Sequence, residues 1–266
     1  MSELVKKISE EVLNLCEKEP LCDWQHVIRV TRMAIKLAQY EKTADMEVVQ
    51  LASLLHVLSK PVYNKNDIGL KQAVAFLKVY QVPHDKISLI VDILKNVHFQ
   101  GSGVLTNMSS IEGKIVQDAH RLETLGAVGL AELFSEGVAK EKPLYTENEK
   151  IKKHISLEAY LNSKTSSIGT LHEELYLLKD KMNTLAAKRI AAKRHNFMKK
   201  FEAQFKMEWL GQDADPVIAK MQATSPWQDP YFQHFMQFMD AALKQPIKFK
   251  GIDFMAMPLI EDKSKK

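Results

Sequence analysis

Apolar residues recur at steps of three and four along nearly the whole chain, and the period-two alternation of β-strands is almost absent. Steps of three and four place apolar side chains on one face of a helix. The 266 residues include only ten Gly and nine Pro, which is few for a fold built from many tight turns. The sequence therefore predicts an all-α protein and argues against an all-β sandwich.

Residues that cap or break helices divide this pattern into segments. Ser2, Asp23 and Asp45 each precede an apolar-periodic stretch and can cap a helix N-terminus, whereas Pro20 and Pro61 end two of these stretches. The stretch that follows Asp45 is so apolar that we expect it at the centre of the core. Further helices are predicted over residues 69–79, 83–96, 111–134, 166–182 and 184–209.

Two segments between these helices have the composition of loops. Residues 99–110 are rich in Gly and Ser. Residues 137–163 are polar, and the length of this segment suggests a functional or mobile connection.

The composition changes after Trp209. Residues 211–266 contain five of the nine prolines and a cluster of aromatic and Met side chains. We therefore predict a main domain over residues 1–210 and an appendage over residues 211–266, with one short helix that begins at Pro230. The apolar face of this helix could fold back on the main domain, pack across a homodimer or bind a protein partner.

Charge and composition exclude several classes of protein. The chain has 37 basic and 33 acidic residues, which are interspersed, so a nucleic-acid duplex is not an expected partner. No segment approaches the roughly 18 apolar residues of a membrane span, and the first residues form an amphipathic pattern instead of a signal peptide. Cys16 and Cys22 are too few for a disulfide framework or a cysteine-based zinc site. These features predict a cytoplasmic protein.

Three metal-competent side chains lie inside otherwise apolar helical stretches. They are His26 in DWQHVIRV, His56 in LASLLHVL and Asp118 in GKIVQDAHRL. An unpaired buried imidazole or carboxylate costs several kcal/mol. The three groups could satisfy one another around a divalent cation, or each could bind a backbone carbonyl or lie at the surface.

Several segments in order carry a resemblance to a known family: DWQHVIRVTRMAIKLAQYE, VVQLASLLHVL, HFQG, IEGKIVQDAHRLETLGAVGLAELF, KPLY and LKDKMNTLAAKRIAAKRHNFMKKF. Over residues 1–210 the chain resembles a compact branch of the HD-domain phosphohydrolase superfamily, which includes bacterial proteins similar to nucleoside triphosphate pyrophosphohydrolases. The resemblance implies an all-helical HD domain that holds Mn²⁺, Mg²⁺ or a similar metal through His26, His56 and Asp118. It also implies a nucleotide or another phosphorylated small molecule as substrate.

The chain departs from the family pattern at the proposed metal site. Val57 replaces the aspartate of the His-Asp pair, and Lys60 replaces an acidic residue shortly after it. The two nitrogens and one oxygen that remain would suit Fe²⁺, Zn²⁺ or Mn²⁺ better than Mg²⁺. His120 stands where the family often has an acidic residue and could substitute as a ligand, but it points to a different helix face from Asp118.

Three further residues could act on a substrate. His98 matches a histidine of the family and could face the pocket or cap the preceding helix. Arg121 could meet a phosphate or pair with a carboxylate, and Lys142 lies in the KPLY segment, where a basic group could approach the substrate. Gly126 and Gly129 are expected to allow close helix packing.

These observations leave three functional interpretations. The first is a metal-dependent phosphohydrolase weakened by the loss of the aspartate at Val57. The second is a catalytically inactive HD protein that binds a nucleotide or a protein partner. The third makes residues 211–266 an interaction module.

Overall fold

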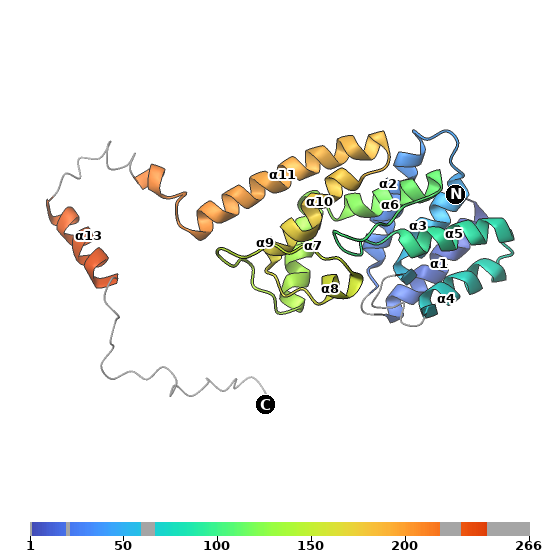
Figure 1. The fold of residues 1–266 in the computed structure, drawn as a ribbon, viewed down its shortest axis with the longest axis horizontal. Helices are drawn as coiled ribbons and strands as arrows, with labels where there is room; N and C mark the ends of the chain where they lie inside the picture. The colour runs from blue at the N-terminus through green and yellow to red at the C-terminus, as the bar shows by residue number, and fades with distance from the viewer. Residues whose placement is uncertain (1, 20–21, 60–66, 219–229, 244–266) are drawn as a thin grey trace, which may run out of the picture. The chain divides into compact units, whose positions relative to one another are not determined.

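Every regular element of the described chain is helical (Figure 1). The computed structural model describes residues 2–19, 22–59, 67–218 and 230–243, and the all-α prediction is confirmed. The contacts divide the chain into two compact units, Met1–Ala203 and Gln204–Lys266. The division predicted after residue 210 lies at the end of helix α11 (Leu185–Trp209), and the boundary between the two units falls inside this helix.

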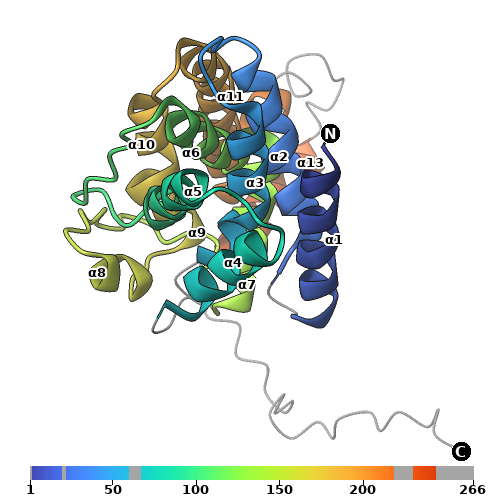
Figure 2. The ribbon, with the colours of Figure 1, turned by 90° about the vertical axis from the view of Figure 1, so that its right-hand side faces the viewer.

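Helix α3 (Met46–Leu55) is the centre of the first unit. Its neighbours, seen around it in Figure 2, are α1 (Glu3–Lys18), α2 (Trp24–Ala38), α5 (His84–Asn96) and α6 (Ile111–Glu123). Helix α4 (Ile68–Val79) packs against α1 and α5. Nearly every side chain from Val48 to Leu55 is buried, which confirms the predicted central position of this stretch.

The predicted caps explain where the first helices begin. The Ser2 side chain accepts a hydrogen bond from the Val5 amide, and Asp23 and Asp45 cap α2 and α3 in the same way. Each cap satisfies an amide that has no partner inside the helix. Helix α3 continues into the 3₁₀ turn η1 (His56–Ser59). The predicted breakers Pro20 and Pro61 lie outside the described residues.

The single helix predicted over residues 111–134 is wrong. The chain forms two helices, α6 and α7 (Gly126–Ala139), because Leu125 between them is extended, with a ψ of 148°, and Gly126 turns the chain with a positive φ of 86°. Gly129 lets the start of α7 fold closely onto the end of α6. A Cβ at this position would lie 2.0 Å from the Thr124 carbonyl oxygen.

The second half of the first unit is less regular. After α8 (Leu157–Leu161) the chain follows one helical run composed of α9 (Ser167–Thr170), the π-helical turn η3 (Leu171–Leu175), α10 (Tyr176–Leu178) and η4 (Lys179–Lys181). The helix predicted over residues 166–182 therefore exists, but it contains a π turn. Such turns are rare and often lie at functional sites.

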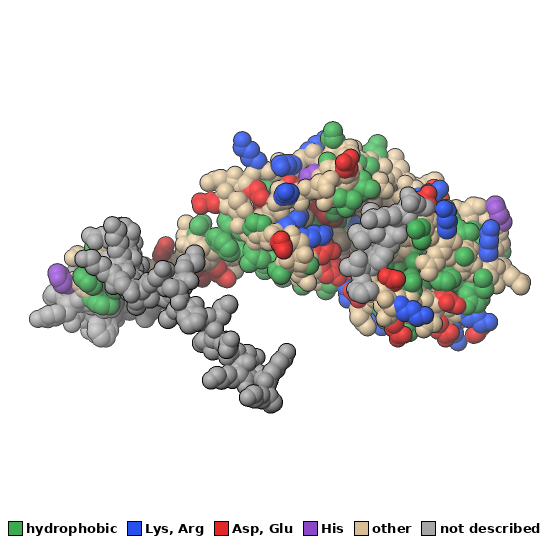
Figure 3. Space-filling model, turned by 90° about the horizontal axis from the view of Figure 1, so that it is seen from below, with side chains coloured by type: hydrophobic (Ala, Val, Ile, Leu, Met, Phe, Trp, Pro, Cys, Tyr) green, Lys and Arg blue, Asp and Glu red, His purple; other side chains and the backbone are tan. Residues whose placement is uncertain are grey.

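A disulfide joins Cys16, near the end of α1, to Cys22, just before α2. The sequence predicted no disulfide framework and left this single bridge unrecognised. Basic and acidic side chains are interspersed on the face of the molecule drawn in Figure 3.

In the second unit, helix α13 (Pro230–Leu243) begins at the predicted proline. Phe235, Met236 and Met239 on this helix are exposed. Of the helices in the described ranges, none combines the length and the apolar character needed to cross a membrane.

Candidate metal centre

Four histidines from separate parts of the chain meet beside α3. His26 lies on α2, His56 in η1, His98 just after α5 and His120 on α6. The Nε2 atoms of His26 and His56 are 3.0 Å apart. The ring centroid of His120 lies 5.6 Å from that of His26 and 5.3 Å from that of His56. His26, His56 and His98 are buried and His120 is partly buried. The helices thus enclose a cluster of imidazoles.

The backbone fixes the orientation of His56. Its Nδ1 atom lies 2.6 Å from the Ser53 carbonyl oxygen. A carbonyl oxygen only accepts, so Nδ1 carries the proton and Nε2 presents a lone pair toward His26. Holding one ring nitrogen on a carbonyl is how proteins commonly orient a metal-binding histidine.

His98 packs its ring edge-on against His120, with the centroids 4.7 Å apart. Its Nε2 atom lies 3.1 Å from both the His56 carbonyl oxygen and the Ser59 hydroxyl. The ring therefore lies in the cluster, which agrees with the first of the two positions predicted for His98 from the sequence. Its Nε2 atom contacts His56 and Ser59 of η1. This places His98 as a support for His120 and His56.

The structure brings His120, and not the predicted Asp118, together with His26 and His56. One ring nitrogen from each of His26, His56 and His120 lies within 4.8 Å of the others, whereas Asp118 is not grouped with them among the described residues. The two positions differ by 200° around helix α6, so only one of them can face the cluster. The sequence signal was present in QDAHRL, where His120 stands at a position that is often acidic in the family.

The Asp118 carboxylate is used to join α6 to the start of α11. Its Oδ1 accepts from the Asn183 amide at 2.8 Å and from the Asn183 side chain at 2.9 Å. Its Oδ2 accepts from the Thr184 amide at 2.7 Å and from the Thr184 hydroxyl at 2.8 Å. Burial raises the pKa of Asp118, and these four hydrogen bonds act in the opposite direction. Asp118 is therefore a structural carboxylate in this geometry.

Carboxylates approach the cluster from its His26 side. Oxygens of Glu123 and Glu132 lie within 4.8 Å of a His26 ring nitrogen and of each other. Both carboxylates also pair with Arg29, which donates to Glu123 and, at 2.6 Å, to Glu132. Burial alone would lower the pKa of Arg29, but the ion pairs raise it, so the guanidinium stays charged. Sequence reasoning missed both glutamates.

Val57 is buried and offers no ligand atom beside His56. It lines a small cavity of about 160 Å³ together with Cys22 and Gly69, and none of the four clustered histidines lines this cavity. Lys60 lies outside the described residues.

The two basic residues predicted to steady a phosphate have other partners. Arg121 is buried and donates to the Lys181 carbonyl and, at 2.9 Å, to the Thr106 hydroxyl. Burial lowers the pKa of Arg121 to about 10. Lys142 donates to the Thr170 hydroxyl at 3.2 Å, and burial lowers its pKa. Neither contact directs these groups toward the histidines.

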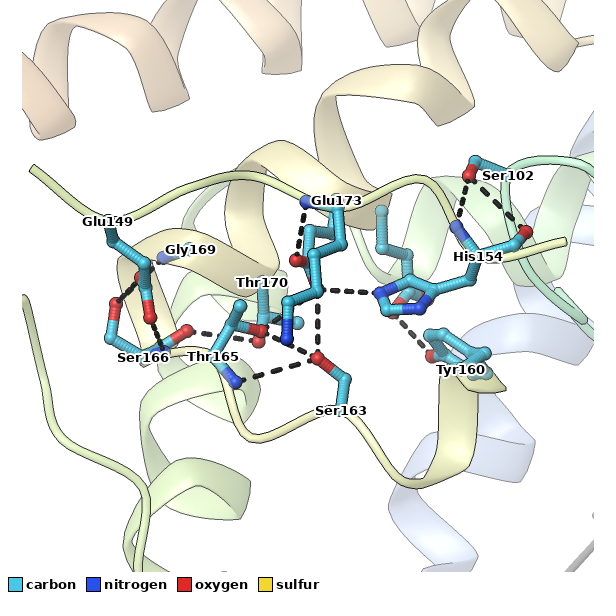
Figure 4. Close-up of polar contacts among 12 residues, drawn as sticks. Ser102, Glu149, His154, Tyr160, Ser163, Thr165, Ser166, Gly169, Thr170 and Glu173 are labelled. Atoms are coloured by element: carbon cyan, nitrogen blue, oxygen red, sulfur yellow. Dashed lines mark hydrogen bonds and ion pairs between the residues drawn. The ribbon is translucent and has the colours of Figure 1, made fainter. Parts of the chain in front are cut away.

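A second polar cluster, drawn in Figure 4, holds the long segment before α9 in place. Glu173 accepts hydrogen bonds from the Lys152 amide, from His154 at 2.7 Å, and from the hydroxyls of Ser163 and Thr165. Burial alone would raise the pKa of Glu173, but these donors lower it. The predicted functional or mobile connection over residues 137–163 is therefore fastened to the π turn η3 near its end.

The neighbouring Glu174 differs from Glu173 in its surroundings. Tyr160 donates to it at 2.5 Å, and burial raises the pKa of Glu174 to about 7, with Glu136 adding to the increase. Sequence reasoning missed this cluster too. The signal was the acidic pair inside the apolar pattern TLHEELYLL.

The fold and the histidine cluster define the class of the protein. The chain matches the HD domain over residues 23–125, a range that contains all four clustered histidines. With the relatives described next, this shows that the chain belongs to the HD superfamily.

Particular relatives are bacterial. YpgQ of Bacillus subtilis is 32% identical over 195 residues, which cover 73% of this chain and 87% of YpgQ. A crystal structure of an HD-superfamily hydrolase from Bacillus thuringiensis has a TM-score of 0.62 at 32% identity and covers 78% of this chain and 97% of the other. YpgQ crystallised in complex with ADP gives a TM-score of 0.59 at 26% identity, covering 77% and 95% of the two chains.

Proposed function

We propose that this protein is a metal-dependent phosphohydrolase of reduced activity, acting on a nucleotide or another phosphate ester. The observation that carries the proposal is the convergence of His26, His56 and His120, whose ligand atoms lie within 4.8 Å of one another. Three buried or partly buried imidazoles have little reason to share one pocket unless they hold a cation together.

The donor set fits a divalent metal that accepts nitrogen ligands. Zn²⁺ and Fe²⁺ bind imidazole well, and three histidines form a common catalytic zinc site. Mn²⁺ and especially Mg²⁺ prefer oxygen, which Val57 does not supply. We therefore expect Zn²⁺ or Fe²⁺ to bind more tightly than Mn²⁺, and Mg²⁺ to bind most weakly.

A metal held there would lower the pKa of a water ligand and polarise a phosphoryl oxygen. The chain itself supplies the positioning. The Ser53 carbonyl holds His56 in one tautomer, and His98 supports His120 from the side. Glu123 and Glu132 lie beside His26, where they would offset part of the positive charge.

The substrate class rests on similarity. YpgQ was crystallised with ADP, and the B. thuringiensis relative is an HD-superfamily hydrolase. A nucleoside di- or triphosphate is accordingly the substrate that we propose to test first.

The buried Val57 also favours a second function, a catalytically inactive HD protein that binds a nucleotide without turning it over. Arg121 and Lys142 strengthen this alternative, because their hydrogen bonds go to Lys181, Thr106 and Thr170.

Metal analysis of the full chain, purified without added metal, separates these functions when it is combined with a hydrolysis assay. Near-stoichiometric Zn or Fe, together with slow release of phosphate or pyrophosphate from nucleoside triphosphates, supports the hydrolase. Nucleotide binding without product in the presence of each metal supports the inactive protein. Failure to bind any divalent metal would overturn the proposed centre.

A further inference from the structure

A groove of about 510 Å³ lies between α2, the end of α6, the start of α7 and α11, and borders the histidine centre at Glu123. Pockets for small molecules are commonly about 300–1,000 Å³, so the groove has the size of a ligand site. None of the four clustered histidines lines it. Its charged lining consists of Arg29, Arg32, Lys36, Glu123, Lys193 and Arg194.

The charge of this lining is strongly unbalanced. Five of its side chains are basic and one is acidic, while the whole chain carries a formal charge of only +4. Arg29 is neutralised by Glu123 and Glu132. Arg32, Lys36 and Lys193 have no carboxylate partner in the described part of the chain, and all three are exposed. Such a concentration of unmatched cations in a concave surface attracts anions.

The spacing of the cations favours an anion with several charges. Arg32 and Lys36 lie one turn apart on α2, and Lys193 approaches from α11. A single phosphate can meet only part of this set, whereas a chain of two or three phosphates can extend across it. The start of α7 adds a weaker favourable field, because its N-cap residue Leu125 provides no side-chain hydrogen bond.

The wall of the groove also includes apolar surface. Phe197, about half exposed, and Met33 lie beside the cations. An aromatic ring next to a phosphate-binding surface can stack with a nucleobase. We propose that the unmatched cations of this groove, which borders the histidine centre at Glu123, bind the polyphosphate group of a small molecule.

The test measures tripolyphosphate binding to the full chain by titration calorimetry in EDTA, which removes metal from the histidine centre. Replacing the three unmatched cations, in Arg32→Gln/Lys36→Gln/Lys193→Gln, should raise Kd roughly tenfold or more, since exposed ion pairs each contribute about 0.2–1 kcal/mol. The matched control Lys7→Gln/Lys78→Gln/Lys95→Gln removes the same charge from exposed positions outside the groove. It should change Kd less than twofold.

Two further arms locate the site and its ligand. His56→Gln should retain tripolyphosphate binding in EDTA, which keeps this test independent of the proposed hydrolase. ATP should bind at least as tightly as tripolyphosphate, and a Phe197→Ala change that weakens ATP alone would place the nucleoside against this ring. Absence of binding to the unaltered protein, equal losses in the two triple variants, or loss of binding in His56→Gln would each overturn the proposal.

Discussion

The Nε2 atoms of His26 and His56 lie 3.0 Å apart, and the second of them presents a lone pair because Nδ1 of His56 faces the Ser53 carbonyl. Without a cation, His26 must donate a proton across this gap. With a cation between them, both nitrogens would direct a lone pair at the metal. His56 is therefore already oriented to bind a metal through Nε2, whereas His26 must first move the proton from its Nε2.

Removing His120 should empty the proposed centre without unfolding the protein. His120→Ala leaves two of three imidazoles, so we expect metal affinity to fall by more than the roughly 10–100-fold that loss of a supporting contact causes. The metal content after purification and a competition titration with a chromophoric chelator measure this loss.

Two controls accompany His120→Ala. His84→Ala removes an exposed histidine at the start of α5 and should leave the metal content unchanged. Asp118→Asn should also retain metal. Normal metal content in His120→Ala with loss in Asp118→Asn would restore the ligand set predicted from the sequence.

Restoring an acidic residue beside His56 should shift the metal preference. Val57→Asp adds an anionic oxygen ligand, so we expect tighter Mn²⁺ binding and faster hydrolysis of nucleoside triphosphates. In EDTA the same buried carboxylate should destabilise the fold by several kcal/mol, about 2–5, and Mn²⁺ should reverse this loss.

The control for this variant is Val57→Asn, which has a similar shape and no charge. Thermal unfolding with and without Mn²⁺ compares the two proteins. Equal Mn²⁺ stabilisation of both variants would show that the pocket no longer accommodates a ligand at this position.

Asp118→Ala should lower the stability of the fold and not the metal affinity of the histidine centre. It removes four hydrogen bonds and leaves the donors of Asn183 and Thr184 without their acceptor, so the free energy of unfolding should fall by about 2–4 kcal/mol. Urea unfolding measures the change. Asp180→Ala removes an exposed carboxylate and should change stability by less than about 0.5 kcal/mol. A similarly small effect for Asp118→Ala would contradict this structural role.

The sequence predicted the helices well because their periodicity and their caps are local properties. Asp45 and the apolar run after it defined α3 without any tertiary information. The split at Gly126 was missed because an apolar, helix-compatible pattern continues through it. The break shows only in the backbone, where Leu125 is extended and Gly126 has a positive φ.

The site was harder to predict because two metal-competent residues, two positions apart on one helix, have different surroundings in the folded protein. Asp118 looked like the ligand by type, but Asn183 and Thr184, just before α11, supply four donors to its carboxylate from 65 and 66 residues away. Glu123 and Glu132 were missed for a related reason, since their partner Arg29 lies 94 and 103 residues away in sequence. Such contacts are properties of the assembled fold.

Glu174 should make stability depend on pH near neutrality. Its pKa rises from an ordinary 4.5 to about 7 in the folded protein, so between these values the folded state binds more protons than the unfolded state. The contribution of Glu174 to the free energy of unfolding should therefore fall as pH rises from about 4.5 to about 7. Glu174→Gln removes this titration and still offers Tyr160 an acceptor.

The variant should consequently gain stability relative to the unaltered protein as pH increases, by about 1–3 kcal/mol in total. Urea unfolding of both proteins at pH 5, 6, 7 and 8 gives the difference, from which titrations common to both cancel. The expected curve rises through this range and levels off above pH 7. A difference that stays constant across the four pH values would show that Glu174 is ionised throughout, with its charge offset by Lys140 and Lys142.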